Sequence, residues 1–223
     1  MKKLLLVLAL LALGVAAHAQ APAATAATRP AAPLGQLVQE ATHPSSPAAL
    51  TALAAQLHQA ATQAPTDWLP PYYEAYALVV SAYRSPDGGS TKDQLLNQAD
   101  AALAQARQRH GDASELLALQ AYAYQARLVI DPQARGQEYA PLIDETLAQA
   151  KAANPANPRP YLIEANQTYY MPAEYGGGPA VAQPIYEVAR AKFAAYRPAS
   201  ALGPNWGQDQ VLRQLGTYPA AAK

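Results

Sequence analysis

The stretch from Ile143 to Pro155 reads IDETLAQAKAANP, and its spacing decides the fold. Ile143, Leu147 and Ala150 follow one another at intervals of four and three, so they share one face of an α-helix. Pro155 comes five residues later, where it would stop the helix. Because an amphipathic helix buries its apolar face against a neighbour, the stretch predicts a helix packed through alternating large and small residues.

The same spacing occurs at three further places, which indicates internal repeats. The other sets are Leu53, Leu57, Ala60 and Pro65; Ala99, Leu103, Ala106 and Gly111; and Glu187, Ala191, Ala194 and Ala199. The last three sets lie 44 residues apart, a period typical of stacked helix pairs. Separated by Pro, Gly, Asn and Asp clusters, the predicted helices span 34–42, 48–64, 71–84, 92–109, 113–129, 134–153, 158–171, 180–196 and 205–215, and no strand is expected.

This pattern resembles the tetratricopeptide repeat (TPR), in which a small residue of the first helix faces a small-large-small series in the second. Ala77, Ala121 and Ala165 supply that small residue here. The resemblance implies an all-α, TPR-like helical-hairpin solenoid of about four helix pairs over residues 34–217, with a C-terminal capping helix. The repeat is about ten residues longer than the usual 34, and we expect the extra residues in the turns at 85–91, 131–136 and 172–179.

The C-terminal part is also similar to a group of exported TPR-like proteins of the Bacteroidetes type. The similar residues are Pro172 to Gly178 (PAEYGGG), Ala189 to Phe193, and Pro204 to Gly207 (PNWG). This resemblance implies a fold and a periplasmic location, and it carries no catalytic residue to this chain.

Both ends of the chain lie outside the repeats. Residues 1–19 combine two lysines, an apolar stretch and the triplet Ala17-His18-Ala19, which predicts a cleaved signal peptide. Residues 20–33 are rich in Ala, Pro and Thr, and we expect a disordered tether there. Residues 218–223 are predicted to form a flexible tail. The mature protein is therefore expected to be soluble in the periplasm, without stable membrane insertion after cleavage.

The composition excludes several classes of function. Cysteine is absent, so there are no disulfides and no thiolate sites. Without Lys2 and Lys3, the 16 basic residues become 14 against 16 acidic ones, and nucleic acid is excluded as a partner because it requires a concentrated basic face.

No constellation of residues indicates catalysis. His43, His58 and His110 lie apart in the repeats, so we predict no metal site, and we predict no cofactor. No serine stands in a Gly-x-Ser-x-Gly motif, and Asp112 with Glu115 reads as a helix-capping box. We therefore expect a protein that is not an enzyme, with a hydrolase as a remote alternative.

Tyrosine is the one compositional feature that points to binding. The chain has 14 Tyr and one Phe, and tyrosine suits surfaces that are apolar along the ring and wet at the hydroxyl. Projecting the repeat register onto the concave face of a TPR array gives a candidate groove of Glu74, Ser81, Glu115, Tyr122, Gln125, Arg159, Asn166, Tyr169 and Tyr170.

Three interpretations of this groove remain open. The first is a scaffold that binds an unknown envelope protein or peptide along its concave face. The alternative is a periplasmic glycan or small-molecule binding module, with the tyrosines and Trp206 as contacts. A third interpretation is that most tyrosines only pack between helices.

Overall fold

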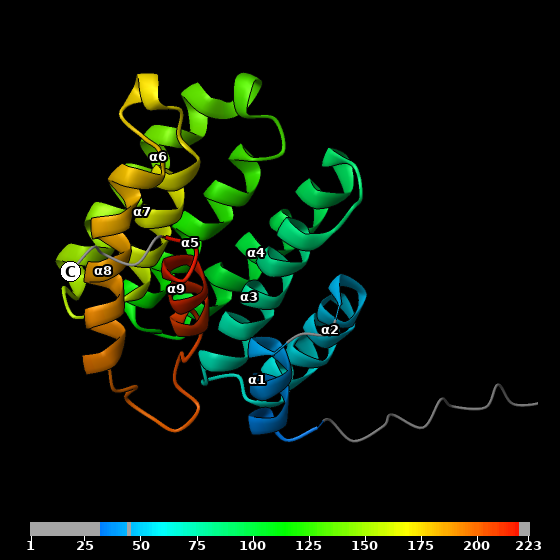
Figure 1. Ribbon diagram of the computed structural model, residues 1–223. Coiled ribbons are helices and arrows are strands. Elements are labelled where there is room, and N and C mark those ends of the chain that lie inside the picture. Colours follow the sequence, from blue (N-terminus) through cyan, green and yellow to red (C-terminus); the bar gives the residue numbers. More distant parts are fainter. Residues whose placement is uncertain (1–31, 44–45, 219–223) are drawn as a thin grey trace, which may run out of the picture. The chain divides into compact units, whose positions relative to one another are not determined.

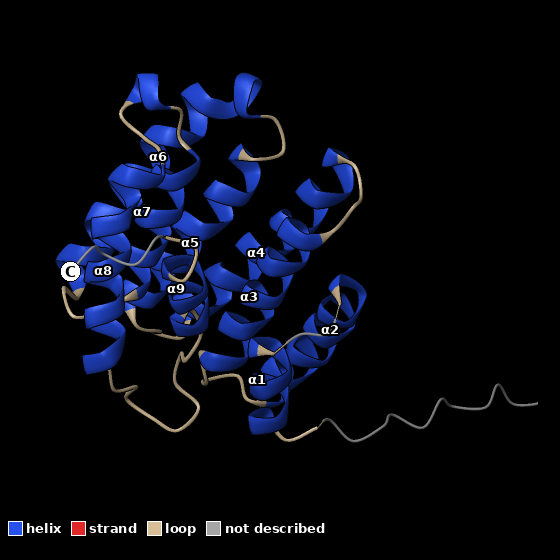
Figure 2. Cartoon of the chain, in the orientation of Figure 1, coloured by secondary structure: helices blue, strands red, loops and turns tan. Residues whose placement is uncertain are grey.

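The computed structural model describes residues 32–43 and 46–218. The predicted signal peptide, residues 20–31 of the predicted tether and residues 219–223 of the predicted tail lie outside the described residues. Within the described ranges all regular structure is helical (Figure 2). The elements are α1 (Leu34–Thr42), α2 (Pro47–Gln63), α3 (Leu69–Arg84), α4 (Gly89–Gln108), α5 (Ala113–Leu128), α6 (Pro132–Ala153), α7 (Arg159–Tyr170), the 3-10 turn η1 (Ala173–Tyr175), α8 (Pro179–Ala195) and α9 (Gln208–Leu215).

The helices pack as successive hairpins, which confirms the predicted all-α, solenoid-like arrangement (Figure 1). Each odd-numbered helix from α1 to α7 packs against the even-numbered helix that follows it. The odd-numbered helices also contact one another in the order α1, α3, α5 and α7, and we call them the inner helices. Helix α9 packs against α8 after the last pair. No described helix has the length and apolar character needed to cross a membrane.

Local signals set the helix ends. The Ser46 side chain accepts a hydrogen bond from Ala49 N at the start of α2, and Asp131 does the same for Ala134 N in α6. Asp112 caps α5 by accepting from Glu115 N at 2.9 Å, as the predicted capping box requires. The Glu115 side chain, however, does not return to the cap, since it is engaged in a buried ion pair described below.

The repeat register is confirmed in the middle of the array and is wrong in the last pair. Ala99, Leu103 and Ala106 are buried in α4, as are Ile143, Leu147 and Ala150 in α6. In α8, Ala191 and Ala194 are exposed, and the buried face consists of Ala182, Tyr186, Ala189 and Phe193. Turning the helix to bury Tyr186 and Phe193 removes far more apolar surface from water than burying two alanines would.

The additional length of the repeat lies mostly in helices, which corrects the expectation of long turns. Helix α4 has 20 residues and begins at Gly89, while α6 has 22 residues and begins at Pro132. Proline is favourable in the first helical turn, so Pro132 starts α6 inside the stretch assigned to a turn. Of the three turns expected to be long, only the one between α7 and α8 (171–178) is an extended connection, and it contains η1.

Adding bulk at the small repeat positions is expected to destabilise the protein. Ala106 and Ala150 have no exposed surface, so Ala106→Leu and Ala150→Leu should each lower the free energy of unfolding by about 1–3 kcal/mol. Ala104 is exposed on the same helix as Ala106, and Ala104→Leu is the control that should change little. Urea unfolding measures all three. Equal stability of the three variants would contradict the register.

Candidate aromatic binding site

Four stacked aromatic rings form a row across the inner helices. Tyr76 and Tyr83 lie seven residues apart on one face of α3, Tyr122 comes from α5, and Trp206 precedes α9. Trp206 stacks on Tyr76 and Tyr122, with ring centroids 4.9 Å and 5.8 Å apart. Tyr122 in turn stacks on Tyr83 at 4.9 Å. These four rings, called here the aromatic row, join three parts of the chain into one apolar strip.

The segment after α8 turns back onto the inner helices and places Trp206 there. Trp206 is only 4% exposed. Gly207 has φ 105°, a backbone conformation that favours glycine. An added Cβ at Gly207 would lie 2.8 Å from both Leu162 and Phe193, so a side chain could not fit without displacing them. The chain's own C-terminal segment therefore covers the end of the inner surface that holds the N-termini of α5 and α7.

A buried polar network anchors that covered end. Trp206 Nε1 donates to Tyr72 Oη at 2.8 Å, and the Tyr72 hydroxyl donates to Glu115 Oε2 at 3.1 Å. Glu115 Oε1 accepts from Arg159 Nη1 at 2.8 Å and from the Tyr196 hydroxyl at 3.2 Å. Burial raises the pKa of the Glu115 carboxyl, and the Arg159 guanidinium opposes this shift. Through these bonds the network joins Trp206 and Tyr196 of the C-terminal segment to the N-terminal ends of α3, α5 and α7.

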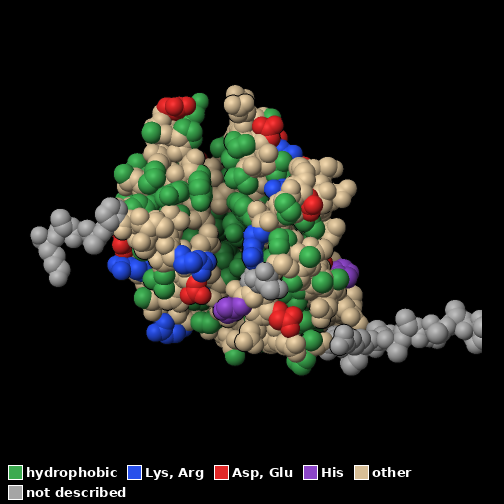
Figure 3. Space-filling model, turned by 45° about the vertical axis from the view of Figure 1, so that its right-hand side comes forward, with side chains coloured by type: hydrophobic (Ala, Val, Ile, Leu, Met, Phe, Trp, Pro, Cys, Tyr) green, Lys and Arg blue, Asp and Glu red, His purple; other side chains and the backbone are tan. Residues whose placement is uncertain are grey.

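The opposite end of the inner surface is open. Tyr169 and Tyr170 end α7, their ring centroids lie 4.9 Å apart edge to face, and Tyr170 is 75% exposed. Tyr218 from the end of the described chain lies against Tyr169 at 6.5 Å, and its hydroxyl donates to Pro179 O at 3.0 Å. Tyr218, the first residue of the predicted tail, thus packs against the end of α7 and the start of α8. Figure 3 shows a hollow near the centre of the drawn face, where hydrophobic side chains gather.

Tyr83 and Tyr122 of the aromatic row both have a pKa above the ordinary value of tyrosine. Burial raises the pKa of Tyr83 well above its usual value, and the nearby Tyr122 and Tyr170 contribute in the same direction. Burial likewise raises the pKa of Tyr122 to about 12. Protonated phenol rings offer flat apolar faces with hydroxyls at their edges, which is a surface suited to a flat conjugated molecule.

The predicted groove residues divide into three groups. The first group comes from the C-terminal parts of α5 and α7 and consists of Tyr122, Gln125, Asn166, Tyr169 and Tyr170. The side-chain amide oxygen of Gln125 accepts a hydrogen bond from the Tyr83 hydroxyl. Asn166 Oδ1 accepts from the Tyr186 hydroxyl at 2.7 Å, which ties α7 to α8. Glu115 and Arg159 are buried in the network under Trp206.

The third group, Glu74 and Ser81, faces away from the aromatic row. Ser81 Oγ donates to Pro47 O of α2 at 3.1 Å, and the Glu74 carboxylate lies 3.1 Å from His58 Nδ1, also on α2. The expected register placed these two side chains on the concave face, whereas α3 presents them to α2. The repeat register of the later helix pairs does not hold in α3, because this helix turns Tyr72, Tyr76 and Tyr83 towards the inner surface instead.

Sequence reasoning therefore missed the tyrosines of α3 as part of the row. The signal that could have found them is the seven-residue interval between Tyr76 and Tyr83, which places two rings on one face of a helix. Trp206 was named only as a contact of the alternative binding module. Its docking position could not be deduced, because it depends on contacts with Tyr76 and Tyr122, far away in the sequence.

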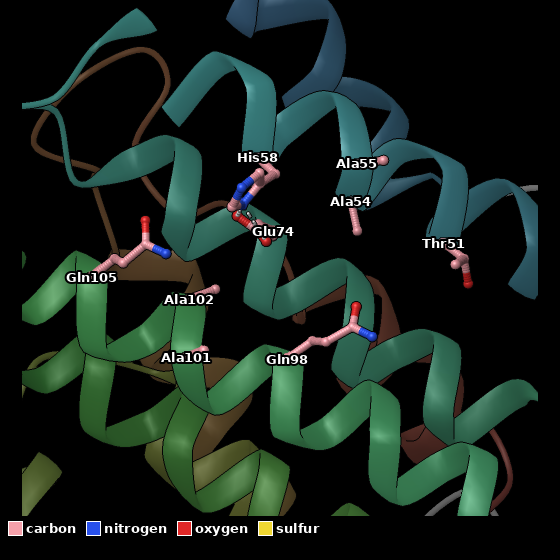
Figure 4. A pocket seen from close by; sticks show the side chains of 9 residues that line it. All are labelled: Thr51, Ala54, Ala55, His58, Glu74, Gln98, Ala101, Ala102 and Gln105. Carbon is pink, nitrogen blue, oxygen red and sulfur yellow. Dashed lines mark hydrogen bonds and ion pairs between the residues drawn. The ribbon is translucent and has the colours of Figure 1, made fainter. Parts of the chain in front are cut away.

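A second hollow lies between α2 and α4, with α3 beneath it (Figure 4). It has a volume of about 450 Å³ and contains the His58–Glu74 pair. Burial raises the pKa of the Glu74 carboxyl, and His58 opposes this shift. The other lining residues are Thr51, Ala54, Ala55, Gln98, Ala101, Ala102 and Gln105. Apart from the His58 imidazole, no lining side chain is aromatic, so this groove has no row of stacked rings.

Metal-binding clusters are absent from the part of the chain that the structure describes, where no three His, Cys, Asp or Glu side chains gather. The fold and the aromatic row together define an all-helical repeat protein whose inner surface is aromatic rather than charged. No protein-family model and no curated protein matches the chain.

A solved structure does match, namely the HusA haemophore from Porphyromonas gingivalis. It is 33% identical to this chain, its TM-score is 0.74, and the alignment covers 85% of this chain and 95% of the haemophore. The chain belongs to the family of that protein.

Proposed function

We propose that this protein binds haem, through the porphyrin ring, at the open end of the aromatic row. The observation that carries the proposal is the continuous stack from Trp206 through Tyr122 to Tyr83, together with the exposed Tyr170 at the end of the inner helix α7. A flat conjugated ligand gains most from such parallel and edge-on aromatic contacts. The name of the related protein, a haemophore, supports the same class of ligand.

The position of Trp206 bears on the choice between a peptide-binding scaffold and a small-molecule binding module. A peptide lying along the whole concave face would have to displace Trp206, which is buried and hydrogen-bonded to Tyr72. This argues against a TPR-type peptide scaffold and favours the alternative, a small-molecule binding module with a Tyr-rich groove. We propose that the module binds and carries its ligand without catalysis, and that the predicted signal peptide delivers it to the periplasm or beyond.

Titration with haemin tests the proposal. The wild-type protein should shift the Soret absorption of haemin saturably. Tyr170→Ala should weaken binding about thirtyfold, because removing an aromatic anchor from a binding contact costs about 2 kcal/mol. Since Tyr170 is 75% exposed, the substitution should leave the thermal melting temperature unchanged.

Tyr175 provides the matched control. It is 73% exposed in η1, almost as much as Tyr170, but among the described residues it has no ring contact, whereas Tyr170 lies edge to face with Tyr169. Tyr175→Ala should therefore bind haemin as the wild type does. Absence of saturable binding by the wild type, or wild-type affinity in Tyr170→Ala, would contradict the proposal.

A further inference from the structure

Gln125 occupies a buried position between the aromatic row and α7. The residue comes from α5 and is 5% exposed. Its Nε2 donates to Ile163 O and to Gln167 Oε1, both at 3.0 Å, and its Oε1 accepts from the Tyr83 hydroxyl at 3.2 Å. One side chain thus connects α3, α5 and α7 at the open end of the inner surface.

The orientation of the Gln125 amide follows from its partners. The carbonyl oxygen of Ile163 can only accept a hydrogen bond, so the amide nitrogen must face it. The amide oxygen is consequently turned towards Tyr83, and it can only accept. The Tyr83 hydroxyl must therefore donate, which leaves one favourable position for its ring. A flipped amide would set oxygen against oxygen at Ile163.

We infer that Gln125 is a positioning residue of the haem site, which fixes the last ring of the aromatic row without touching the ligand. The inference rests on the proposed function. Tyr83 stacks on Tyr122 at 4.9 Å on one side and is tethered at its hydroxyl by Gln125, so both the plane and the tilt of the ring are set before a ligand arrives. Such preorganisation improves affinity because less conformational freedom is lost on binding.

Four proteins test this role by haemin titration: the wild type, Gln125→Met, Tyr83→Phe and the double variant. Tyr83→Phe removes only the hydrogen bond between Tyr83 and Gln125, so it should weaken binding about five- to tenfold, the equivalent of one hydrogen bond. Gln125→Met removes this bond and those to Ile163 and Gln167, so it should weaken binding by at least as much. The double variant should bind no more weakly than Gln125→Met alone, because that substitution has already removed the bond to Tyr83. Circular dichroism of the bound haemin in the Soret region should change alike in all three variants, since it depends on the geometry of nearby rings.

Gln120→Met is the matched control on the same helix. Its amide donates to Asp100 on α4, away from the aromatic row, so haemin affinity should remain that of the wild type. Wild-type affinity in folded Gln125→Met, or a double variant whose loss is the product of the single losses, would overturn the inference. If Gln125→Met does not fold, Tyr83→Phe alone tests the inference. Unchanged haemin affinity and unchanged Soret dichroism in Tyr83→Phe would then overturn the positioning role of the hydrogen bond between Gln125 and Tyr83. A wild type that binds no haemin contradicts the proposed function instead.

Discussion

Replacement of Arg159 by methionine is expected to lower the free energy of unfolding by about 3–5 kcal/mol, which is the usual cost of breaking a buried ion pair. The Arg159 side chain has no exposed surface, and its partner Glu115 is 5% exposed. The substitution would leave the Glu115 carboxylate without its cation in a site that already penalises its charge. The guanidinium carbon also lies 4.8 Å from the Tyr196 ring centroid and 5.1 Å from that of Trp206, and those contacts would be lost.

Urea unfolding followed by circular dichroism measures this effect. The double variant Arg159→Met and Glu115→Gln should recover part of the loss, because it removes the unpaired charge as well. Lys151 pairs with Glu164 at the surface, and Lys151→Met is the control, with an expected loss below about 1 kcal/mol. If Arg159→Met lost no more than this control, the buried network would not anchor the fold.

Removal of the Trp206 side chain is the second large effect. Trp206→Ala should cost about 3–5 kcal/mol, because the residue is 4% exposed, stacks on two tyrosines and donates a hydrogen bond to Tyr72. The variant should also release the C-terminal segment, so limited proteolysis should cut after Tyr196 faster than in the wild type. The loss of stability and the faster proteolysis would have the same cause, namely the loss of the packed Trp206 side chain.

Two further variants separate the contributions of Trp206. Trp206→Phe keeps a ring but removes the indole donor, and it should lose less stability than Trp206→Ala. Leu212 lies on α9 in the same segment and is 50% exposed, so Leu212→Ala should change stability little. A Trp206→Ala protein as stable and as protease-resistant as the wild type would mean that the segment is not docked.

The two anchors explain why the proposed site occupies only one end of the inner surface. At the end near Arg159, the ion pair with Glu115 is buried and Trp206 packs over the ring of Tyr76, so the chain itself fills this part of the inner surface. At the other end, Tyr83 and Tyr122 are only partly buried and Tyr170 is exposed. A ligand can bind where the chain has not already filled its own groove.

The sequence by itself determined the helices and most of their packing faces. Helix periodicity, capping residues and prolines act over a few residues, so they can be read without knowing what lies across the fold. The stretch predicted as 113–129 is Ala113–Leu128, and Ala106 and Ala150 are buried as their spacing requires. Helix periodicity also placed the candidate residues Tyr122, Gln125 and Tyr169 correctly near the open end of the inner surface.

Only the tertiary structure decided which side of each helix faces the proposed site. Periodicity tells which residues share a face, but the rotation of α3 depends on what its neighbours bury, so Glu74 and Ser81 face α2. Trp206 and Tyr76 meet across a long sequence separation, and no local pattern encodes such a contact. Arg159 was expected to face a ligand and instead pairs with Glu115, because the returning C-terminal segment excludes water from both.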